Sequence, residues 1–186
     1  MDNSRHAGMT LTELITALLV VSTLSAIALP ALDDFFKRQL ALSEVTALRQ
    51  LVYQARGHAI TSGVPAVLCP ISANECSTNW SEGKITLFED LDRNRKIDPN
   101  DKVLTHFQLQ QANRVKLDFP RSAIVFYPSG FAQGFTGSLL YCRSTEPPIT
   151  MSLIISRVGR VRHGTDSNND GILESATGKN APCPSA

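Results

Sequence analysis

An uncharged apolar run near the amino terminus constrains this chain most. No ionisable side chain occurs between Leu14 and Leu32, and the carboxylate of Glu13 stands directly before the run. At about 1.5 Å per residue, a helix of this length is long enough to cross the hydrocarbon core of a membrane. The run therefore predicts a helix that spans a membrane once.

Glu13 is the unusual residue of this segment. A carboxylate in lipid is costly, and ionisable residues inside membranes are rare and usually paired. A helix that begins at Met9 would place Glu13 near the unpaired amide groups of its first turn. The simplest further partner is a free amino terminus, which would exist if the chain were cut between Gly8 and Met9.

The residues around this point resemble a known processing signal. The stretch Gly8-Met9-Thr10-Leu11-Thr12-Glu13-Leu14 is similar to the signal of type IV pilins and pseudopilins, which prepilin peptidase cleaves after the glycine before it methylates the new first residue. This resemblance implies that Gly8 and Met9 are processing residues and that Glu13 serves filament assembly. Phenylalanine is commoner than methionine at the position of Met9. A secretory signal peptide or a plain membrane anchor explains neither Gly8 nor Glu13.

Four cysteines indicate an oxidising compartment, such as the periplasm. They form an even set without CxxC spacing or clustered histidines, which argues against zinc and for disulfides. Three pairings are possible in principle. We favour Cys69 with Cys76, which closes a short loop. The remaining pair, Cys142 with Cys183, would then tie the tail to a central strand.

The predicted helix continues beyond the membrane. After Asp33 and Asp34, apolar residues recur at steps of three and four and define an amphipathic face that should pack on a soluble domain. These residues are Val45, Leu48, Leu51, Val52, Ala55 and Ala59. Pro30 should bend the helix near the membrane exit. Gly63, followed by Pro65, should end it.

From residue 64 onward the pattern changes to short β-rich runs separated by turn residues. Each run has the length of a strand and is bounded by Gly, Pro, Asn or Asp. The runs are 64–68, 84–88, 103–109, 115–119, 124–127, 138–141 and 149–155. Strands do not alternate with helices, so antiparallel sheets with one face on the helix are favoured. The predicted fold class is α+β, with a long amino-terminal helix packed on one or two antiparallel sheets.

In order and spacing, these elements resemble the minor pilin family that joins FimT of type IV pili to the H pseudopilin, GspH, of type II secretion. The resemblance runs over nearly the whole chain and implies the pilin fold. It implies four segments: a leader peptide over residues 1–8, a transmembrane and assembly half of the helix over 9–32, an amphipathic periplasmic half over 33–63, and a β-rich periplasmic domain with disulfides over 64–186.

Two acidic loops offer oxygen ligands of the kind that calcium prefers. In the loop from Asp90 to Asp101, Arg95 replaces the glycine of a calcium loop, so a solvated hairpin is favoured there. The loop with Asp166, Asn168 and Asp170 keeps the glycine, but Asn-Asp-Gly is also an ordinary turn former. These last three residues are the calcium candidates, and no other metal or cofactor is expected.

No catalytic residue is predicted. The four histidines are scattered along the sequence, and no serine lies in a GxSxG elbow. The chain has no phosphate-binding loop of the Walker A or Rossmann type, so the energy for any motion must come from a partner ATPase. The sequence therefore favours a structural or binding protein over an enzyme.

The charged residues gather locally rather than in bulk. The chain carries 18 Lys and Arg against 17 Asp and Glu, so any attraction to nucleic acid must be local. The sharpest basic cluster is the run Arg157–His163, which follows the apolar run 149–155. If the chain continues there as a strand, Arg160 and Arg162 project to one face, because side chains alternate. Guanidinium groups at that spacing can bridge successive phosphates of a nucleic acid.

This basic run resembles the GRxR motif of FimT-type minor pilins, which bind DNA for uptake in naturally transformable bacteria. By that resemblance, Gly159, Arg160 and Arg162 would bind double-stranded DNA. An alternative stays open, namely a solvated edge strand whose basic residues prevent association between sheet edges.

Together the motifs predict a minor pilin or pseudopilin that primes or caps a type IV pilus or a type II secretion filament. The alternative is a purely structural H pseudopilin of type II secretion that does not bind DNA. The resemblance implies three kinds of protein partner: other pilins or pseudopilins, prepilin peptidase and the inner-membrane assembly platform. It also implies a single-pass protein of the inner membrane, with its carboxy-terminal domain in the periplasm.

Overall fold

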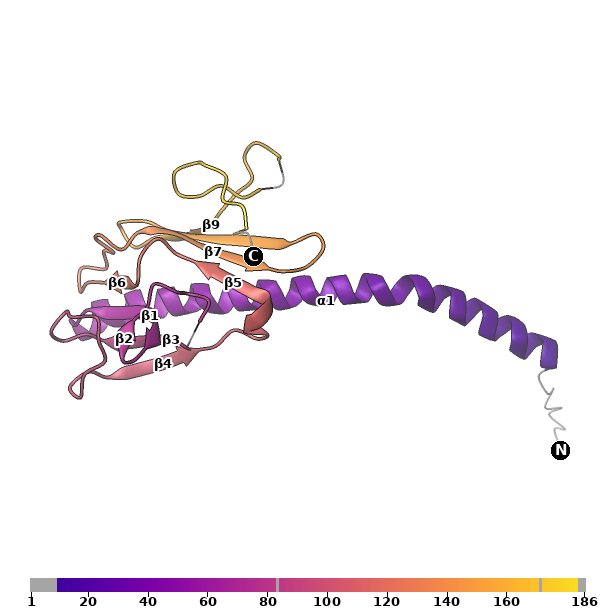
Figure 1. Cartoon of the computed structure of the whole chain (residues 1–186), viewed down its shortest axis with the longest axis horizontal. Helices are drawn as coiled ribbons and strands as arrows, with labels where there is room; N and C mark the ends of the chain where they lie inside the picture. The colour runs from indigo at the N-terminus through magenta and orange to yellow at the C-terminus, as the bar shows by residue number, and fades with distance from the viewer. Residues whose placement is uncertain (1–9, 83, 171, 184–186) are drawn as a thin grey trace, which may run out of the picture. The chain divides into compact units, whose positions relative to one another are not determined.

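The computed structural model describes residues 10–82, 84–170 and 172–183 (Figure 1). The predicted processing residues Gly8 and Met9 lie outside the described residues. The chain divides into two compact units, residues 1–40 and residues 41–186. Helix α1 (Leu11–Ser62) contributes to both units, and each unit is described by itself.

In the first unit, α1 is apolar and open to its surroundings. The side chains described from Thr10 to Phe36 are all exposed. By length and composition, α1 is suited to cross a membrane, with a mean hydropathy of 2.2 in its most apolar window. An exposed surface of this kind fits a segment that lies in lipid rather than in water. The bend predicted at Pro30 stays a prediction.

In the second unit, α1 buries the face that the sequence predicts. All six predicted apolar residues from Val45 to Ala59 are at most 6% exposed, and Ala41 extends the same face by one turn. The helix ends at Ser62, and Gly63 adopts the left-handed conformation with φ +72°. Its N–H donates to the carbonyl of Ala59 at 3.2 Å, so the predicted glycine stop is confirmed.

Two antiparallel sheets accompany this part of α1 (Figure 1). The first sheet has five strands in the order β2-β1-β3-β4, with β6 paired to β1. Its strands are β1 (Ala66–Ser72), β2 (Glu75–Cys76), β3 (Lys84–Glu89), β4 (Val103–Phe107) and β6 (Ile124–Phe126). The second sheet has four strands in the order β5-β7-β8-β9. They are β5 (Val115–Asp118), β7 (Gly137–Arg143), β8 (Ile149–Ile155) and β9 (Val161–His163). A short 3-10 helix (Ala112–Arg114) directly precedes β5.

One face of each sheet shares a core with α1. From the first sheet, Leu68, Leu87 and Phe126 lie in this core. From the second sheet, Leu117, Leu139, Tyr141, Leu153 and Ile155 join them. A smaller cluster, which includes Val67, Phe88 and Val125, covers the other face of the first sheet. The fold class is α+β, as the sequence predicts, and it uses two sheets.

The basic run after β8 differs from its sequence-based description. It does not continue β8 as a strand but turns at Ser156–Gly159 and returns as β9, antiparallel to β8. The N–H of Gly159 donates to Ser156 at 2.9 Å, and the N–H of Ser156 donates to Arg160 at 3.0 Å. Gly159 has φ +75°, a conformation that glycine adopts at low cost, so the chain can reverse here.

Both favoured disulfide pairings are present. Cys69 and Cys76 are joined within the β1–β2 hairpin, and their Cα atoms are 5.5 Å apart. Cys142 on β7, a strand with neighbours on both sides, is joined to Cys183 in the carboxy-terminal tail. The tail is therefore fixed to the middle of the second sheet.

Candidate functional site

The outer face of the second sheet, which turns away from the shared core, carries a hollow of about 580 Å³. Arg157, Arg160 and Arg162 all line it. The tail segment Ser175–Thr177 also belongs to the lining. We call this hollow the arginine groove.

Strand β9 sets the direction of two of the three arginines. Val161 is 4% exposed and joins the core, whereas Arg160 and Arg162 on either side of it are exposed. Because side chains alternate along a strand, both arginines project to the outer face and into one groove. The sequence-based expectation that they share a face holds, although they do so on the return strand of a hairpin.

Gly159 holds the arginine hairpin against its neighbours. A Cβ atom at this position would lie 2.3 Å from the carbonyl oxygen of Gly130 and 2.7 Å from Nε of Arg56. Arg56 Nε donates to that same carbonyl at 3.1 Å, and the N–H of Ala132 donates to the carbonyl of Arg157 at 2.9 Å. The glycine of the GRxR motif is thus a positioning residue, since no larger side chain fits.

The tail part of the groove is fixed by hydrogen bonds and a disulfide. The N–H of Ala176 donates to Ser138 Oγ on β7 at 2.7 Å. The carboxylate of Glu174, which is 8% exposed, accepts the N–H of Ser167 at 2.8 Å and so closes the tail on itself. The Cys142–Cys183 disulfide then anchors its end. The groove is therefore formed before any ligand arrives.

The calcium candidates lie in this same tail. The N–H of Asp170 donates to Asp166 Oδ1 at 3.2 Å and to Asn168 Oδ1 at 3.1 Å. Asp170 in turn accepts the N–H of Ile172 at 2.8 Å and the amides of Asn168 and Asn180. These hydrogen bonds, led by that of Ile172, lower the pKa of Asp170 below its ordinary value. They are the contacts of an ordered turn, and calcium binding there stays a prediction.

The other acidic loop joins the antiparallel strands β3 and β4 and is mostly exposed, in agreement with the solvated hairpin expected from the sequence, but its first acidic residue is buried. Asp90 is only 1% exposed and accepts the N–H groups of Asn94 and Arg95, each at 3.1 Å. Burial raises the pKa of Asp90 despite these hydrogen bonds. Among the residues that the structure describes, no group of three or more His, Cys, Asp or Glu side chains is arranged to hold a metal ion.

Glu13, the predicted assembly residue, lies in the first turn of α1. Its Oε2 accepts the N–H and the hydroxyl of Thr10, both at 2.9 Å, and its own N–H donates to Thr10 Oγ1 at 3.3 Å. This reciprocal pattern is a capping box, which satisfies amide groups that would otherwise lack partners at the helix start. The carboxylate thus has a structural role within the chain in addition to its predicted role between subunits.

The sequence did not indicate a polar network inside the core. Glu44 lies on the buried face of α1 and accepts the hydroxyl hydrogen of Tyr141 on β7. Arg143 lies beside both, with its guanidinium 3.3 Å from the Tyr141 hydroxyl. Burial, together with the Glu44 carboxylate, raises the pKa of Tyr141 well above its ordinary value. The one sequence feature that could have indicated this network is Glu44, an acidic residue among the apolar positions of the amphipathic face.

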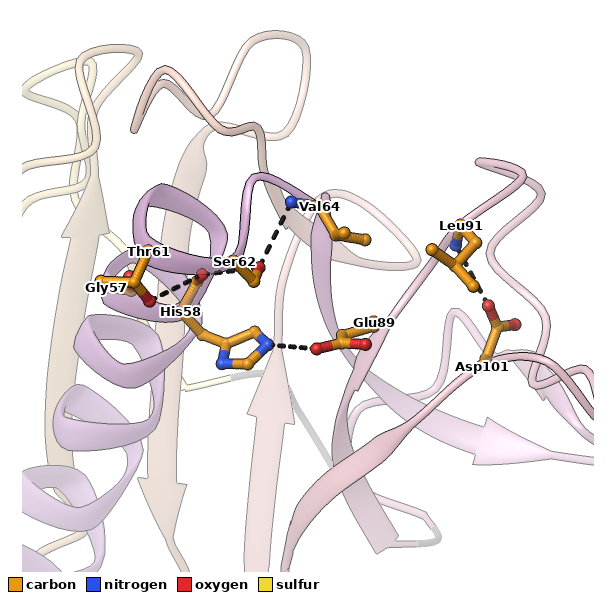
Figure 2. A network of polar contacts seen from close by, with 8 residues as sticks. All are labelled: Gly57, His58, Thr61, Ser62, Val64, Glu89, Leu91 and Asp101. Carbon is orange, nitrogen blue, oxygen red and sulfur yellow. Dashed lines mark hydrogen bonds and ion pairs between the residues drawn. The ribbon is translucent and has the colours of Figure 1, made fainter.

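A second polar network joins the end of α1 to the first sheet (Figure 2). His58 Nε2 lies 2.6 Å from Glu89 Oε1 on β3. Ser62 Oγ donates to the carbonyl of His58 at 2.8 Å and accepts the N–H of Val64 at 3.2 Å. These contacts satisfy polar groups at the end of the helix. They stabilise the connection from α1 to β1, and we assign no separate functional site to them.

Comparisons with known proteins agree with this fold. The family model described as type II transport protein GspH matches residues 44–159. The pilin-like protein PilA1 of Thermus thermophilus is 32% identical over 163 residues, which cover 83% of this chain and 96% of that protein. The crystal structure of the type IV minor pilin FimU of Pseudomonas aeruginosa (strain PAO1) has a TM-score of 0.50 at 16% identity, over 69% of this chain and 90% of that one, and shows the fold alone. The chain belongs to the GspH/FimT family of pilin-like proteins, the minor pilins and pseudopilins.

Proposed function

We propose that this chain is a minor pilin that primes or caps a type IV pilus and binds DNA through the arginine groove. The observation that carries this proposal is the convergence of Arg157, Arg160 and Arg162 on one preformed groove. Guanidinium groups contact phosphates with two parallel hydrogen bonds and stay charged at any physiological pH. Their contribution does not depend on base sequence and weakens as salt rises.

The assembly part of the proposal rests on the amino-terminal segment. Prepilin peptidase would cleave after Gly8 and methylate Met9, and the new ammonium group would pair with Glu13 of a neighbouring subunit. The chain would lie in the inner membrane, with residues 64–186 in the periplasm, and would meet other pilins on the assembly platform. Two disulfides support the assignment to an oxidising compartment.

A second candidate is a structural H pseudopilin of type II secretion without DNA binding. The description of the matching family model supports it. So does the position of β9, because a basic edge strand also discourages pairing with other sheets.

DNA binding by the full chain in detergent distinguishes the two candidates. In a salt titration of fluorescence anisotropy with arbitrary-sequence duplex DNA, we expect a dissociation constant of roughly 10⁻⁴ to 10⁻⁶ M at physiological salt. Changing both Arg160→Gln and Arg162→Gln should remove most binding. The control changes Lys102→Gln and Arg114→Gln, which remove the same charge from exposed positions outside the groove lining. Equal binding by both double variants would favour the structural pseudopilin.

A further inference from the structure

The arginine groove has a floor that phosphate binding alone does not require. The outer-face residues Leu140 on β7 and Ile154 on β8 line it together with Pro120. Gly137 makes this floor possible, because a Cβ there would lie 2.6 Å from Cγ of Pro120. The missing side chain lets the proline ring pack directly on the start of β7. An apolar floor beside three arginines offers two kinds of contact to one ligand.

The remaining lining is polar and carries no negative charge. Hydroxyl side chains contribute, among them Thr136, Ser156 and Thr177, and no acidic side chain lines the groove in the part of the chain that the structure describes. Hydroxyl groups can donate to phosphate and sugar oxygens and can also accept from base amides. The lining therefore suits a ligand that combines an anion, a polar ring and a flat apolar face.

The size of the groove separates single strands from duplexes. A hollow of about 580 Å³ lies within the usual range of small-ligand sites, roughly 300–1,000 Å³. A duplex presents phosphates and sugars at its surface while its bases stay stacked inside, so it can reach the arginines but not the floor. An unpaired strand exposes its bases as well as its phosphates, and proteins that bind such strands usually stack the bases on aromatic side chains beside cationic groups. In this groove aliphatic side chains would take the place of the aromatic ones.

We infer that the arginine groove takes an unpaired nucleic-acid strand, with phosphates on Arg160 and Arg162 and a base over Leu140 and Ile154. This inference rests on the proposed DNA binding and specifies which form of DNA enters the groove. Because the groove is preformed by the tail bonds and the disulfide, little ordering is needed on binding. Duplex DNA touches only the arginine rim and binds more weakly.

The test compares three labelled probes on the full chain in detergent. The first is a single strand of about 12 nucleotides, a length within the usual site size. The second is the same strand with abasic sites throughout, which keeps the phosphates and removes the bases. The third is a blunt duplex of the same length. We expect the single strand to bind about five to ten times more tightly than either of the others, since contact between a base and the aliphatic floor adds to phosphate contact.

Three variants identify the contacts. Leu140→Asn should bring single-strand affinity down to that of the abasic probe and should change duplex affinity less than single-strand affinity, and Pro120→Ser should act in the same direction. The change of both Arg160→Gln and Arg162→Gln should weaken all three probes. The affinities of the three probes are compared on the unaltered chain, so this comparison does not depend on any variant. The inference can therefore still be tested if Leu140→Asn does not fold.

Three outcomes would overturn the inference, and they differ in what they imply for the proposed function. If the intact and abasic strands bind equally, the floor does not hold a base, and DNA binding still stands provided that the arginine variant loses it. If the arginine variant binds every probe as well as the unaltered chain does, DNA binding itself fails. Tighter binding of labelled polyglutamate than of the single strand, at the same salt concentration, would instead identify an acidic peptide as the ligand and also overturn the inference.

Discussion

The carboxylate of Glu44 on α1 lies 3.5 Å from the guanidinium of Arg143 on β7, and both side chains are almost wholly buried. The N–H of Gln110 donates to the other carboxylate oxygen at 2.6 Å, and Arg143 also donates to the side-chain oxygen of Gln111 at 3.2 Å. Helix, second sheet and the link between the two sheets therefore meet at one carboxylate.

Removing this carboxylate should destabilise the fold strongly. Glu44→Ala leaves the Arg143 guanidinium buried without its counter-charge, a change that costs roughly 3–5 kcal/mol in comparable buried pairs. Chemical denaturation of the full chain in detergent measures the loss. Glu82→Ala, which removes an exposed carboxylate, is the control and should change stability by less than about 0.5 kcal/mol. Equal unfolding midpoints for the two variants would mean that the buried pair does not hold helix and sheet together.

Processing at the amino terminus predicts a defined mature mass. Cleavage after Gly8 followed by methylation should give a chain that begins at N-methylated Met9, and intact-mass spectrometry of protein from cells with active prepilin peptidase detects it. Gly8→Val should retain the leader, since the glycine at the cleavage point is lost. If the unaltered chain, with Gly8 in place, kept its leader in such cells, the predicted processing would be wrong.

The two roles of Glu13 can be separated by one pair of variants. Glutamine can replace glutamate in a capping box, so Glu13→Gln should keep the bonds to Thr10 while it removes the charge. Glu13→Ala removes both. If the charge pairs with a neighbouring amino terminus, both variants should be cleaved normally and both should be depleted from purified filaments, as measured by immunoblotting. Normal incorporation of Glu13→Gln would restrict this residue to starting the helix.

Gly159→Ala should damage the arginine groove through two separate costs. The new Cβ would clash with the Gly130 carbonyl at 2.3 Å, and the residue would keep φ +75°. Gly134→Ala is the matched control, because Gly134 has φ +78° with nothing within 4 Å of the added Cβ. The control should lose about 1–2 kcal/mol for the backbone conformation alone. Gly159→Ala should lose more stability than this control and should also lose DNA affinity. If chemical denaturation shows the same loss of stability for Gly159→Ala and Gly134→Ala, close packing of the hairpin is unimportant.

Local patterns were sufficient to predict most of the fold. The buried face from Val45 to Ala59 and seven of the nine described strands follow from periodicity and turn residues, which depend on neighbours in sequence. Strand β2 was not predicted, because two residues carry too little pattern to be recognised. Strand β9 was not predicted as a separate strand, because the basic run was considered only as a continuation of the run 149–155. The hairpin at Gly159 depends on close contact with Gly130, which lies far from it in sequence.

The candidate site could be predicted only in part. Alternation of side chains in an extended segment was enough to place Arg160 and Arg162 on one face. The remainder of the groove depends on contacts between distant residues, such as the bond from Ala176 to Ser138 and the packing of Pro120 on Gly137. The burial of Glu44 could not be predicted for the same reason. A charged residue on a buried apolar face is tolerated only where a partner of opposite charge compensates it, and here that partner, Arg143, is distant in sequence.

The anchored tail has a consequence for the order in which this domain matures. Translation produces the arginine hairpin before the tail segment Ser175–Thr177, and Cys183 follows later still. The tail part of the groove lining is therefore made last, and the disulfide that anchors the tail can form only after synthesis has passed Cys183. A chain that ended before Ser175 would carry the three arginines without the tail part of the lining.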